Sequence, residues 1–298
     1  MNETIAARLT CDERTARRVA FFLAESLDGD EAACAAFENQ RGQWEVAVHM
    51  QGAPDEARLR DLVRVAAGND AAQALRFETV DDADWVRQSL EGLKPVRAGR
   101  FLVHGSHDRE RVKPNEIGIE IEAALAFGTG HHGTTRGCLL ALDDLTRRRS
   151  FRRVLDIGTG SGVLAIAAAK LLRKSIVASD IDRVAVDAAR NNARLNHAPR
   201  IAFVHAAGAS ARAIAAHGPY DLVLANILLG PLTRLAVPIR RLVAPGARIV
   251  LSGLLPSHAN AALAYYAAQG FRLERRIPLD GWMTLVLERR RCARSRGR

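Results

Sequence analysis

The sequence has no long apolar segment and no closely spaced cysteines. In its 298 residues no run approaches the roughly 18 apolar residues that a membrane-spanning helix needs, and the first twenty residues alternate charged and apolar positions instead of forming a signal-peptide core. The cysteines, at positions 11, 34, 138 and 292, form no Cys-x-x-Cys pair and have no histidine at ligand spacing. These absences argue against a disulfide framework and a metal site. We therefore expect a cytoplasmic protein that makes no membrane contact and holds no metal.

Positive charge exceeds negative charge, since 43 lysines and arginines against 33 aspartates and glutamates give a formal net charge of +10. Six of the arginines lie in residues 289–298, and a basic tail of this kind is more often a solvated end than an RNA contact. The other arginines are scattered without the aromatic residues that single-stranded nucleic-acid binding tends to use. We expect a partner that is negatively charged or bound to nucleic acid, without sequence-specific nucleic-acid recognition.

A glycine-rich turn is the most informative feature that is present. The residues Asp156-Ile-Gly-Thr-Gly-Ser-Gly162 follow the apolar Arg153-Val-Leu155 and precede an apolar segment from Val163, which is the order strand, turn, helix. Glycine at every second position of the turn removes the Cβ atoms, so backbone N–H groups and the positive helix end can approach a ligand carboxylate. A dinucleotide fingerprint needs its third glycine one residue later, and the Lys-Ser/Thr pair of a P-loop is missing.

An acidic residue follows this turn at the distance that nucleoside-binding folds use. Asp180 ends the next predicted strand, Ser175–Ser179, and lies about 20 residues beyond the turn, where a carboxylate accepts hydrogen bonds from both ribose hydroxyls. A glycine turn alone also serves plain packing, but the turn together with Asp180 favours a nucleoside cofactor. We interpret the pair as an S-adenosylmethionine site.

Strands and helices alternate in the second half of the chain, which predicts a parallel sheet covered on both faces. The predicted strands are Arg153–Ile157, Ser175–Asp180, Ile201–His205, Tyr220–Ile227 and Ala247–Gly253, followed by a closing antiparallel hairpin of Phe271–Arg276 and Trp282–Glu288. Ligands of such sheets bind at the carboxyl ends of the strands, so Gly158, Asp180 and Asn226 should converge.

Asn226 ends an otherwise apolar strand with a single amide. A turn or a helix cap explains an asparagine at such a place equally well, but its position opposite the glycine turn favours a function. Its carbonyl can accept a hydrogen bond from an incoming amine and direct the amine lone pair at a methyl group, while its NH2 group can bind the cofactor. We therefore predict that Asn226 is catalytic and also contacts the cofactor.

The first part of the chain predicts a separate small domain, because 298 residues exceed one typical domain. Hydrophobic periodicity over residues 1–80 gives the order β-α-β-β-α-β of ferredoxin-like domains, with no nucleophile, base or ligand cluster. We interpret it as a substrate-recognition domain. Residues 81–103 are the predicted linker, 104–290 the catalytic domain and 291–298 a basic tail.

A glycine- and hydroxyl-rich loop, Ala126-Phe-Gly-Thr-Gly-His-His-Gly-Thr-Thr135, precedes a predicted helix from Arg136 to about Leu145. It can fold over a ligand, and a threonine at its end can cap the helix. The two adjacent histidines have no carboxylate or cysteine at suitable spacing and do not indicate a metal site.

These motifs together resemble the ribosomal protein L11 methyltransferase family. The resemblance rests on Ala126–His131 with Thr134-Thr135, on Leu155–Ala168, on Ser179–Asp182, on Ala225–Leu228 and on Leu251–Leu255, in this order. It implies a class I S-adenosylmethionine-dependent methyltransferase, which has a Rossmann-like α/β fold with a mostly parallel sheet and an antiparallel end hairpin. A small α+β ferredoxin-like domain would precede this catalytic domain in the sequence. The implied cofactor contacts are Thr135, Gly158, Asp180 and Asn226, and we add Asp156, Gly160 and Phe127 from the same motifs.

The resemblance also implies the chemistry and the partner. An α-amino or lysine amine of ribosomal protein L11, free or on the large ribosomal subunit, would take the methyl group directly from S-adenosylmethionine. Apart from the resemblance, His131 or His132 is a candidate acceptor for the released proton, and water is the alternative. Two other functions stay open. An RNA or small-molecule methyltransferase would share the cofactor site, and a non-catalytic ribosome-assembly factor would bind the cofactor without turnover.

Overall fold

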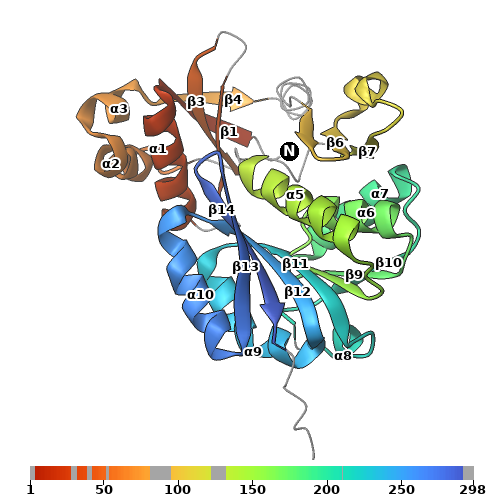
Figure 1. Cartoon of the computed structure of the whole chain (residues 1–298). Helices are drawn as coiled ribbons and strands as arrows, with labels where there is room; N and C mark the ends of the chain where they lie inside the picture. The colour runs from red at the N-terminus through yellow and green to blue at the C-terminus, as the bar shows by residue number, and fades with distance from the viewer. Residues whose placement is uncertain are drawn as a thin grey trace, which may run out of the picture. The chain divides into compact units, whose positions relative to one another are not determined.

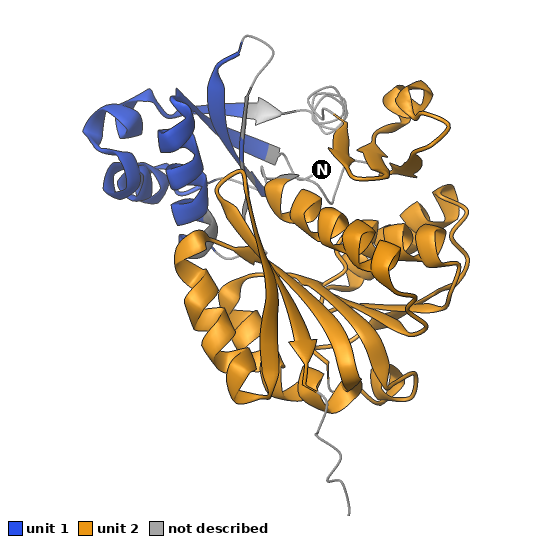
Figure 2. Cartoon of the chain, viewed as in Figure 1, with its two compact units in different colours: residues 1–94, 127–130 blue, residues 95–126, 131–298 orange. Residues whose placement is uncertain are grey.

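The computed structural model describes residues 4–27, 32–38, 42–51, 54–80, 95–121, 132–209 and 211–290. The chain divides into two compact units, one of residues 1–94 with 127–130 and one of residues 95–126 with 131–298 (Figure 2). Each unit is described by itself. Among the described helices, none has the length and apolar character needed to span a membrane.

The first unit is a four-stranded antiparallel sheet with helices packed on it. Its elements are β1 (Thr4–Cys11), α1 (Glu13–Ser26), β2 (Ala32–Glu38), β3 (Trp44–Gln51), α2 (Glu56–Ala67), α3 (Asn69–Ala74) and β4 (Arg76–Val80). The strand order β2-β3-β1-β4 confirms the predicted ferredoxin-like arrangement. Asp12 and Asp55 begin α1 and α2 by accepting from the Thr15 and Arg58 amides at 3.0 and 2.9 Å. The sequence analysis missed α3, which begins after Gly68 at φ +88°.

The second unit contains a seven-stranded sheet in the order β10-β9-β8-β11-β12-β14-β13. Its strands are β8 (Val154–Ile157), β9 (Ile176–Asp180), β10 (Ile201–His205), β11 (Tyr220–Asn226), β12 (Val243–Leu254), β13 (Phe271–Leu279) and β14 (Trp282–Arg289). The pairs from β10 to β12 are parallel, whereas β14 is antiparallel to both β12 and β13. This confirms the predicted parallel sheet and its closing antiparallel hairpin.

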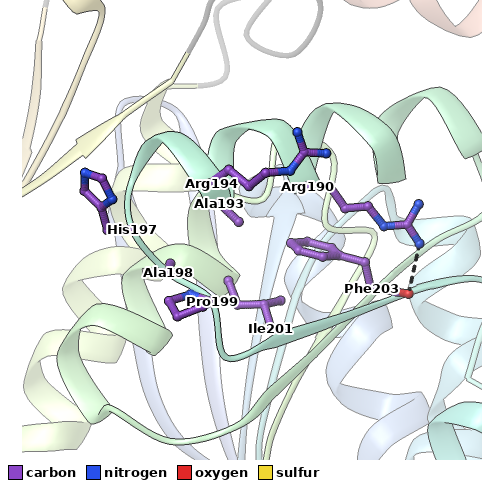
Figure 3. Close-up of a pocket in the computed structure, with 8 residues that line it drawn as sticks. All are labelled: Arg190, Ala193, Arg194, His197, Ala198, Pro199, Ile201 and Phe203. Carbon is purple, nitrogen blue, oxygen red and sulfur yellow. Dashed lines mark hydrogen bonds between the residues drawn. The ribbon is translucent and has the colours of Figure 1, made fainter.

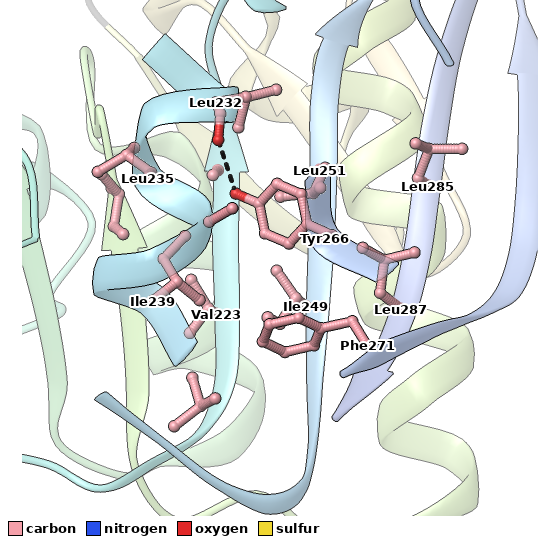
Figure 4. Close-up of a cluster of buried hydrophobic side chains, with 14 of the residues drawn as sticks. Val223, Leu232, Leu235, Ile239, Ile249, Leu251, Tyr266, Phe271, Leu285 and Leu287 are labelled. Atoms are coloured by element: carbon pink, nitrogen blue, oxygen red, sulfur yellow. Dashed lines mark hydrogen bonds between the residues drawn. The ribbon is translucent and has the colours of Figure 1, made fainter. Parts of the chain in front are cut away.

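Helices cover both faces of this sheet (Figure 1). The helices α5 (His132–Arg148), α6 (Val163–Leu172) and α7 (Arg183–Leu195) lie on one face, and α9 (Leu229–Leu242) and α10 (Ala259–Ala268) lie on the other, while α8 (Arg212–Ala215) is a single turn before β11. A core of buried side chains fills the space between α9, α10 and the sheet (Figure 4). There Tyr266 meets Phe271 edge to face at 5.6 Å and donates its hydroxyl to the Leu232 carbonyl at 3.0 Å. The buried hydroxyl is thus satisfied, which avoids a desolvation cost.

A three-stranded sheet at the start of the second unit corrects the predicted linker. Strands β5 (Val96–Ala98), β6 (Phe101–His104) and β7 (Ile117–Glu120), with the short helix η1 (Ser106–Arg111), place residues 95–103 inside the second unit and not between the units. Strands β5 and β7 are too short for an alternating pattern to identify them. The rest of the predicted linker, residues 81–94, and the basic tail, 291–298, lie outside the described residues.

Candidate functional site

The glycine turn connects the end of β8 to α6, and its glycines are required for two different reasons. All three have positive φ, +69° at Gly158, +52° at Gly160 and +82° at Gly162, which only glycine adopts without strain. A Cβ at Gly158 would lie 2.3 Å from Ile227 Cγ2, and one at Gly162 would lie 3.0 Å from Ala189 Cβ. A Cβ at Gly160 would meet no described atom within 4 Å. Gly158 and Gly162 are therefore packing glycines, whereas Gly160 borders open space.

The backbone amides of the turn differ from the expectation. The amides of Gly158 and Thr159 donate to the Ser179 carbonyl at 2.8 and 3.0 Å, and the Gly160 amide donates to Asp180 Oδ2 at 2.8 Å. These three N–H groups already donate hydrogen bonds to atoms of the chain and do not point at a ligand carboxylate. The prediction that they bind a ligand carboxylate is therefore wrong. They attach the turn to β9 instead, which places the turn and the end of β9 side by side.

Asp180 is held in place by that attachment. Its Oδ2 accepts from Gly160 and its Oδ1 accepts from the Asp182 amide at 3.1 Å. Each carboxylate oxygen has a second lone pair, so the group retains capacity for two further hydrogen bonds. Two backbone donors thus orient a partly exposed carboxylate at the carboxyl end of its strand, which suits recognition of two adjacent hydroxyls.

Asp156 lies beneath the turn and is 1% exposed. Its Oδ2 accepts from Thr159 Oγ1 at 2.7 Å and from the Ala165 amide at 3.2 Å, while Oδ1 has no hydrogen-bond partner among the described residues. Burial raises the pKa of Asp156 to about 7, although these two hydrogen bonds act in the opposite direction. A buried carboxylate oxygen without a partner is costly. A positively charged group placed against Oδ1 would remove that cost.

Asn226 ends β11 beside the glycine turn. Its Nδ2 donates to Thr135 Oγ1 on α5 at 3.3 Å. The explanation as a helix cap is wrong, because α9 begins at Leu229 and its N-cap residue is Leu228, with no side-chain cap bond. The threonine cap predicted for α5 is also wrong, since α5 begins at His132 and Thr135 lies inside its first turn. With its NH2 group on Thr135, Asn226 has its carbonyl oxygen left to accept another donor.

A buried hydroxyl cluster holds this first turn of α5, and the sequence analysis missed its role. Ser252 on β12 is 0% exposed and is the register partner of Asn226. Its hydroxyl donates to the Thr134 carbonyl at 3.2 Å and shares a 2.8 Å hydrogen bond with Thr284 Oγ1 on β14. A Cβ at Gly137 would lie 2.2 Å from that Thr284 oxygen, so α5 approaches β14 only because residue 137 is glycine. The signals were a serine after the apolar run Ile249–Leu251 and a threonine before the apolar run Leu285–Leu287.

Two apolar side chains next to the site face solvent. Ile181, directly after Asp180, is 70% exposed, and Leu228, two residues after Asn226, is 49% exposed. Single exposed apolar residues are common, but these two follow the strand ends that carry the polar groups. They supply apolar surface for a flat or aliphatic part of a ligand.

The strand ends converge as predicted, since Gly158 packs on Ile227 and Gly160 bonds to Asp180. Phe127 and His131 lie outside the described residues, as does the side chain of His132. Of the other predicted site residues, Asp156, Gly158, Gly160 and Asp180 belong to one connected group, and Asn226 joins it to Thr135 through β11. Their roles in binding stay predictions.

Comparison with known proteins identifies close relatives of this chain. The family model described as ribosomal protein L11 methyltransferase (PrmA) matches residues 3–290. The chain is 54% identical over 278 residues to the ribosomal protein L11 methyltransferase of Bradyrhizobium diazoefficiens, which covers 93% of this chain and 94% of that protein. It is 53% identical over 291 residues to that of Rhodopseudomonas palustris, with 96% and 99% covered. A crystal structure of ribosomal protein L11 methylase from Lactobacillus delbrueckii subsp. bulgaricus has a TM-score of 0.60 at 26% identity and covers 67% of this chain and 99% of that one.

Proposed function

Because this chain belongs to the ribosomal protein L11 methyltransferase family, we propose that it methylates amino groups of ribosomal protein L11, both the α-amino group and lysine side chains. The methyl donor of the family is S-adenosylmethionine, and the second unit, with its seven-stranded sheet, has the fold of S-adenosylmethionine-dependent methyltransferases. The single observation that carries the proposal is the group of Asp156, Gly160 and Asp180, which offers a buried acceptor, an open space and an oriented carboxylate at one end of the sheet.

The donor set suits S-adenosylmethionine. Asp156 Oδ1, buried and without a partner among the described residues, would accept from the positively charged amino group of the methionine part. Asp180 would accept from the ribose hydroxyls, and Gly160 would border the ligand where a side chain would intrude. Ile181 would contribute apolar contact. When bound, S-adenosylmethionine would supply a methyl group on a sulfonium sulfur, and a substrate amine would bond to that methyl carbon as the carbon–sulfur bond breaks and S-adenosylhomocysteine leaves.

Asn226 is the proposed catalytic residue. Its carbonyl oxygen would accept a hydrogen bond from the substrate amine and orient the nitrogen lone pair, while Thr135 fixes the amide plane from the other side. Only a neutral amine has a free lone pair. A lysine, with a pKa of about 10.4, therefore requires more desolvation or a base than an α-amino group at about 7.7–8.0. His131 or His132 stays a candidate acceptor for the released proton.

The first unit is the proposed substrate-recognition domain. Its sheet offers antiparallel strands and, among its described residues, no buried charged group that would suit catalysis. We propose that it binds ribosomal protein L11, free or on the large ribosomal subunit, in the cytoplasm. No membrane contact and no sequence-specific nucleic-acid recognition belong to this proposal.

The test uses the full chain, heavy-methyl S-adenosylmethionine and unmethylated ribosomal protein L11, with intact mass and labelled peptides as readouts. We expect mass steps of one methyl group, located on the α-amino group and on lysines. Label in RNA or in small molecules, with none on L11, would overturn the substrate. Cofactor binding without any transfer would support an assembly factor instead.

A matched pair of variants tests the role of Asn226. Asn226→Ala should slow transfer on the order of 100-fold, because the amine loses its orienting group, with a smaller effect on cofactor affinity. Asn191→Ala is the control, because Asn191 is an exposed asparagine on α7 away from the strand ends. Equal rates for the two variants would remove Asn226 from the catalytic role.

A further inference from the structure

A pocket of about 540 Å³ lies on the outer edge of the seven-stranded sheet, between the second half of α7, the turn after it and the edge strand β10 (Figure 3). It lies toward the start of β10, where Ile201 pairs with Ile176 at the beginning of β9. The glycine turn and Asp180 lie at the other end of these strands. None of the pocket residues belongs to the cofactor site.

The rim of the pocket is basic. Arg190 and Arg194 are one helical turn apart on α7 and project on the same side. Arg190 bonds to Asp187 Oδ1 at 2.7 Å and to the Phe203 carbonyl at 3.4 Å, which ties α7 to β10. The guanidinium of Arg194 is exposed and makes no ion pair or hydrogen bond with the described residues, and His197 adds a further exposed nitrogen base. In the rim, Arg190 is therefore already paired with Asp187, whereas the Arg194 guanidinium can bind an anionic ligand.

Apart from Asp187, which pairs with Arg190, the sequence around the pocket supplies no negative charge to neutralise this rim. No aspartate or glutamate occurs from residue 188 to residue 220, a segment that contains four arginines. Arg200, just before β10, donates to the Arg173 carbonyl at 2.7 Å, so Arg173 and Lys174 extend the basic surface beyond the pocket. Such a surface attracts a chain of negative charges more than a single anion.

The floor of the pocket is apolar and partly aromatic. Ala193 and Ala198 are buried, and the half-buried Ile201 and Phe203 complete the wall, with the Phe203 ring beside the arginine side chains (Figure 3). A bare phosphate would make no contact that exploits the apolar floor, and an aliphatic ligand would make no ion pair with the basic rim. A nucleotide has both parts, because its base stacks on an aromatic ring while its phosphate meets an arginine.

We propose that this pocket binds one nucleotide of a single-stranded nucleic acid, with its phosphate on Arg194 and its base against Phe203 and Ile201. Arg190 positions the wall by holding the Phe203 backbone, and the neighbouring phosphates of the strand extend toward Arg200, Arg173 and Lys174. Recognition by stacking and phosphate contact tolerates any base sequence. The sequence analysis did not find this site, because the arginines and the phenylalanine come together only when α7 packs on β10.

The test measures binding of fluorescein-labelled ten-nucleotide RNA and DNA strands to the full chain by fluorescence anisotropy over a range of salt concentrations. Arg194→Glu should weaken binding about tenfold and reduce the slope of log K against log salt by about 0.7, the contribution of one phosphate on a single strand. Phe203→Leu keeps the apolar volume but removes the ring, and should weaken binding about fivefold. Arg241→Glu is the control, since Arg241 is exposed on α9 in the same unit and the charge change is identical.

Four results would overturn the proposal. These are no saturation by about 100 μM protein at low salt, equal losses for Arg194→Glu and Arg241→Glu, no loss for Phe203→Leu, and equally tight, Arg194-dependent binding of labelled polyglutamate. The last result would mean that the surface binds any chain of negative charges, including an acidic protein partner, without contacting a base. Cofactor affinity and thermal unfolding, measured on each variant, should match the unsubstituted chain, which keeps this test separate from that of methyl transfer.

Discussion

The two units bury different kinds of side chain. Among the described residues of the first unit, every fully buried side chain is apolar or a cysteine, with Leu9, Val19 and Val48 at its centre. Every buried polar or charged residue of the described chain lies in the second unit, and many surround the carboxyl ends of the strands. Burying a polar group costs free energy unless a partner is present. The second unit buries polar groups where the site needs fixed hydrogen-bond donors and acceptors. The described part of the first unit buries none.

The contrast implies that the two cores serve different ends. An apolar core tolerates changes that keep its volume, so the first unit is a scaffold whose interior need not be specific. In the second unit the buried hydroxyls of Ser252 and Thr284 hold α5 over the strand ends, and Asp156 Oδ1 has no hydrogen-bond partner in the described part of the chain. The following variants separate stability from function on the two sides of this comparison.

The largest effect on stability is expected in the first unit. Leu9, 1% exposed, lies in its core, so Leu9→Ala should lower the free energy of unfolding of this unit by about 2–5 kcal/mol. Hydrogen exchange of the β1 and β3 amides measures that loss. Cofactor affinity, measured by calorimetry, should stay within about threefold, because the two cores share no residue. A larger change would mean that the cores are energetically coupled.

The second effect concerns the pH dependence of stability through Asp156. Its pKa is about 7 in the folded chain, because burial disfavours the charged form, against about 3.9 when unfolded. Between about pH 4 and pH 7 the folded chain binds a proton that the unfolded chain has released, so the free energy of unfolding falls as pH rises, by at most about 4 kcal/mol.

Asp156→Asn should abolish this slope. In urea unfolding without cofactor, the variant should therefore be the more stable protein at pH 8 and similar to the unsubstituted chain near pH 4. Its cofactor affinity should nevertheless drop on the order of tenfold, because the negative charge is lost. Identical pH slopes for the two proteins would show that the Asp156 carboxylate is not penalised by burial.

The hydroxyl cluster predicts an intermediate effect. Gly137→Ala places a Cβ against Thr284 Oγ1 and should cost about 1–3 kcal/mol of stability while slowing transfer, because Thr135 moves with α5. Thr284→Ala makes room for the new methyl group. The double variant should thus lose less than the sum of the single losses, and strict additivity would argue against this contact.

The smallest effect is expected at an exposed ion pair of the first unit. Arg64 pairs with Asp61 at 2.5 Å and both are exposed, so Arg64→Ala should change stability by less than about 1 kcal/mol. The matched change in the second unit is Arg109→Ala, which removes two 2.8 Å hydrogen bonds from the buried Glu120 and should therefore lower the thermal unfolding temperature more than Arg64→Ala does. Thermal unfolding compares the two, and equal losses would contradict the contrast between the units.

Most of the fold was predictable because it follows from local patterns. The strand that ends at Asp180, the glycine turn and the closing hairpin were placed within a few residues by periodicity and turn chemistry. The short strands β5 and β7 were missed because three or four residues carry too little pattern. The turn amides were misassigned because glycine content reveals the positive φ angles but not which acceptor each N–H group finds.

The sequence by itself determined most of the elements, the parallel sheet with its antiparallel end and the convergence of the glycine turn, Asp180 and Asn226. These follow from backbone propensity and from the handed, regular connections of such sheets. The tertiary structure alone decided that Asp156 is buried with one oxygen that has no hydrogen-bond partner among the described residues, that Ser252 reaches Thr134, and that Arg194 shares a pocket with Phe203. Desolvation and packing depend on which distant residues exclude water from a group, and neighbours along the chain do not specify that.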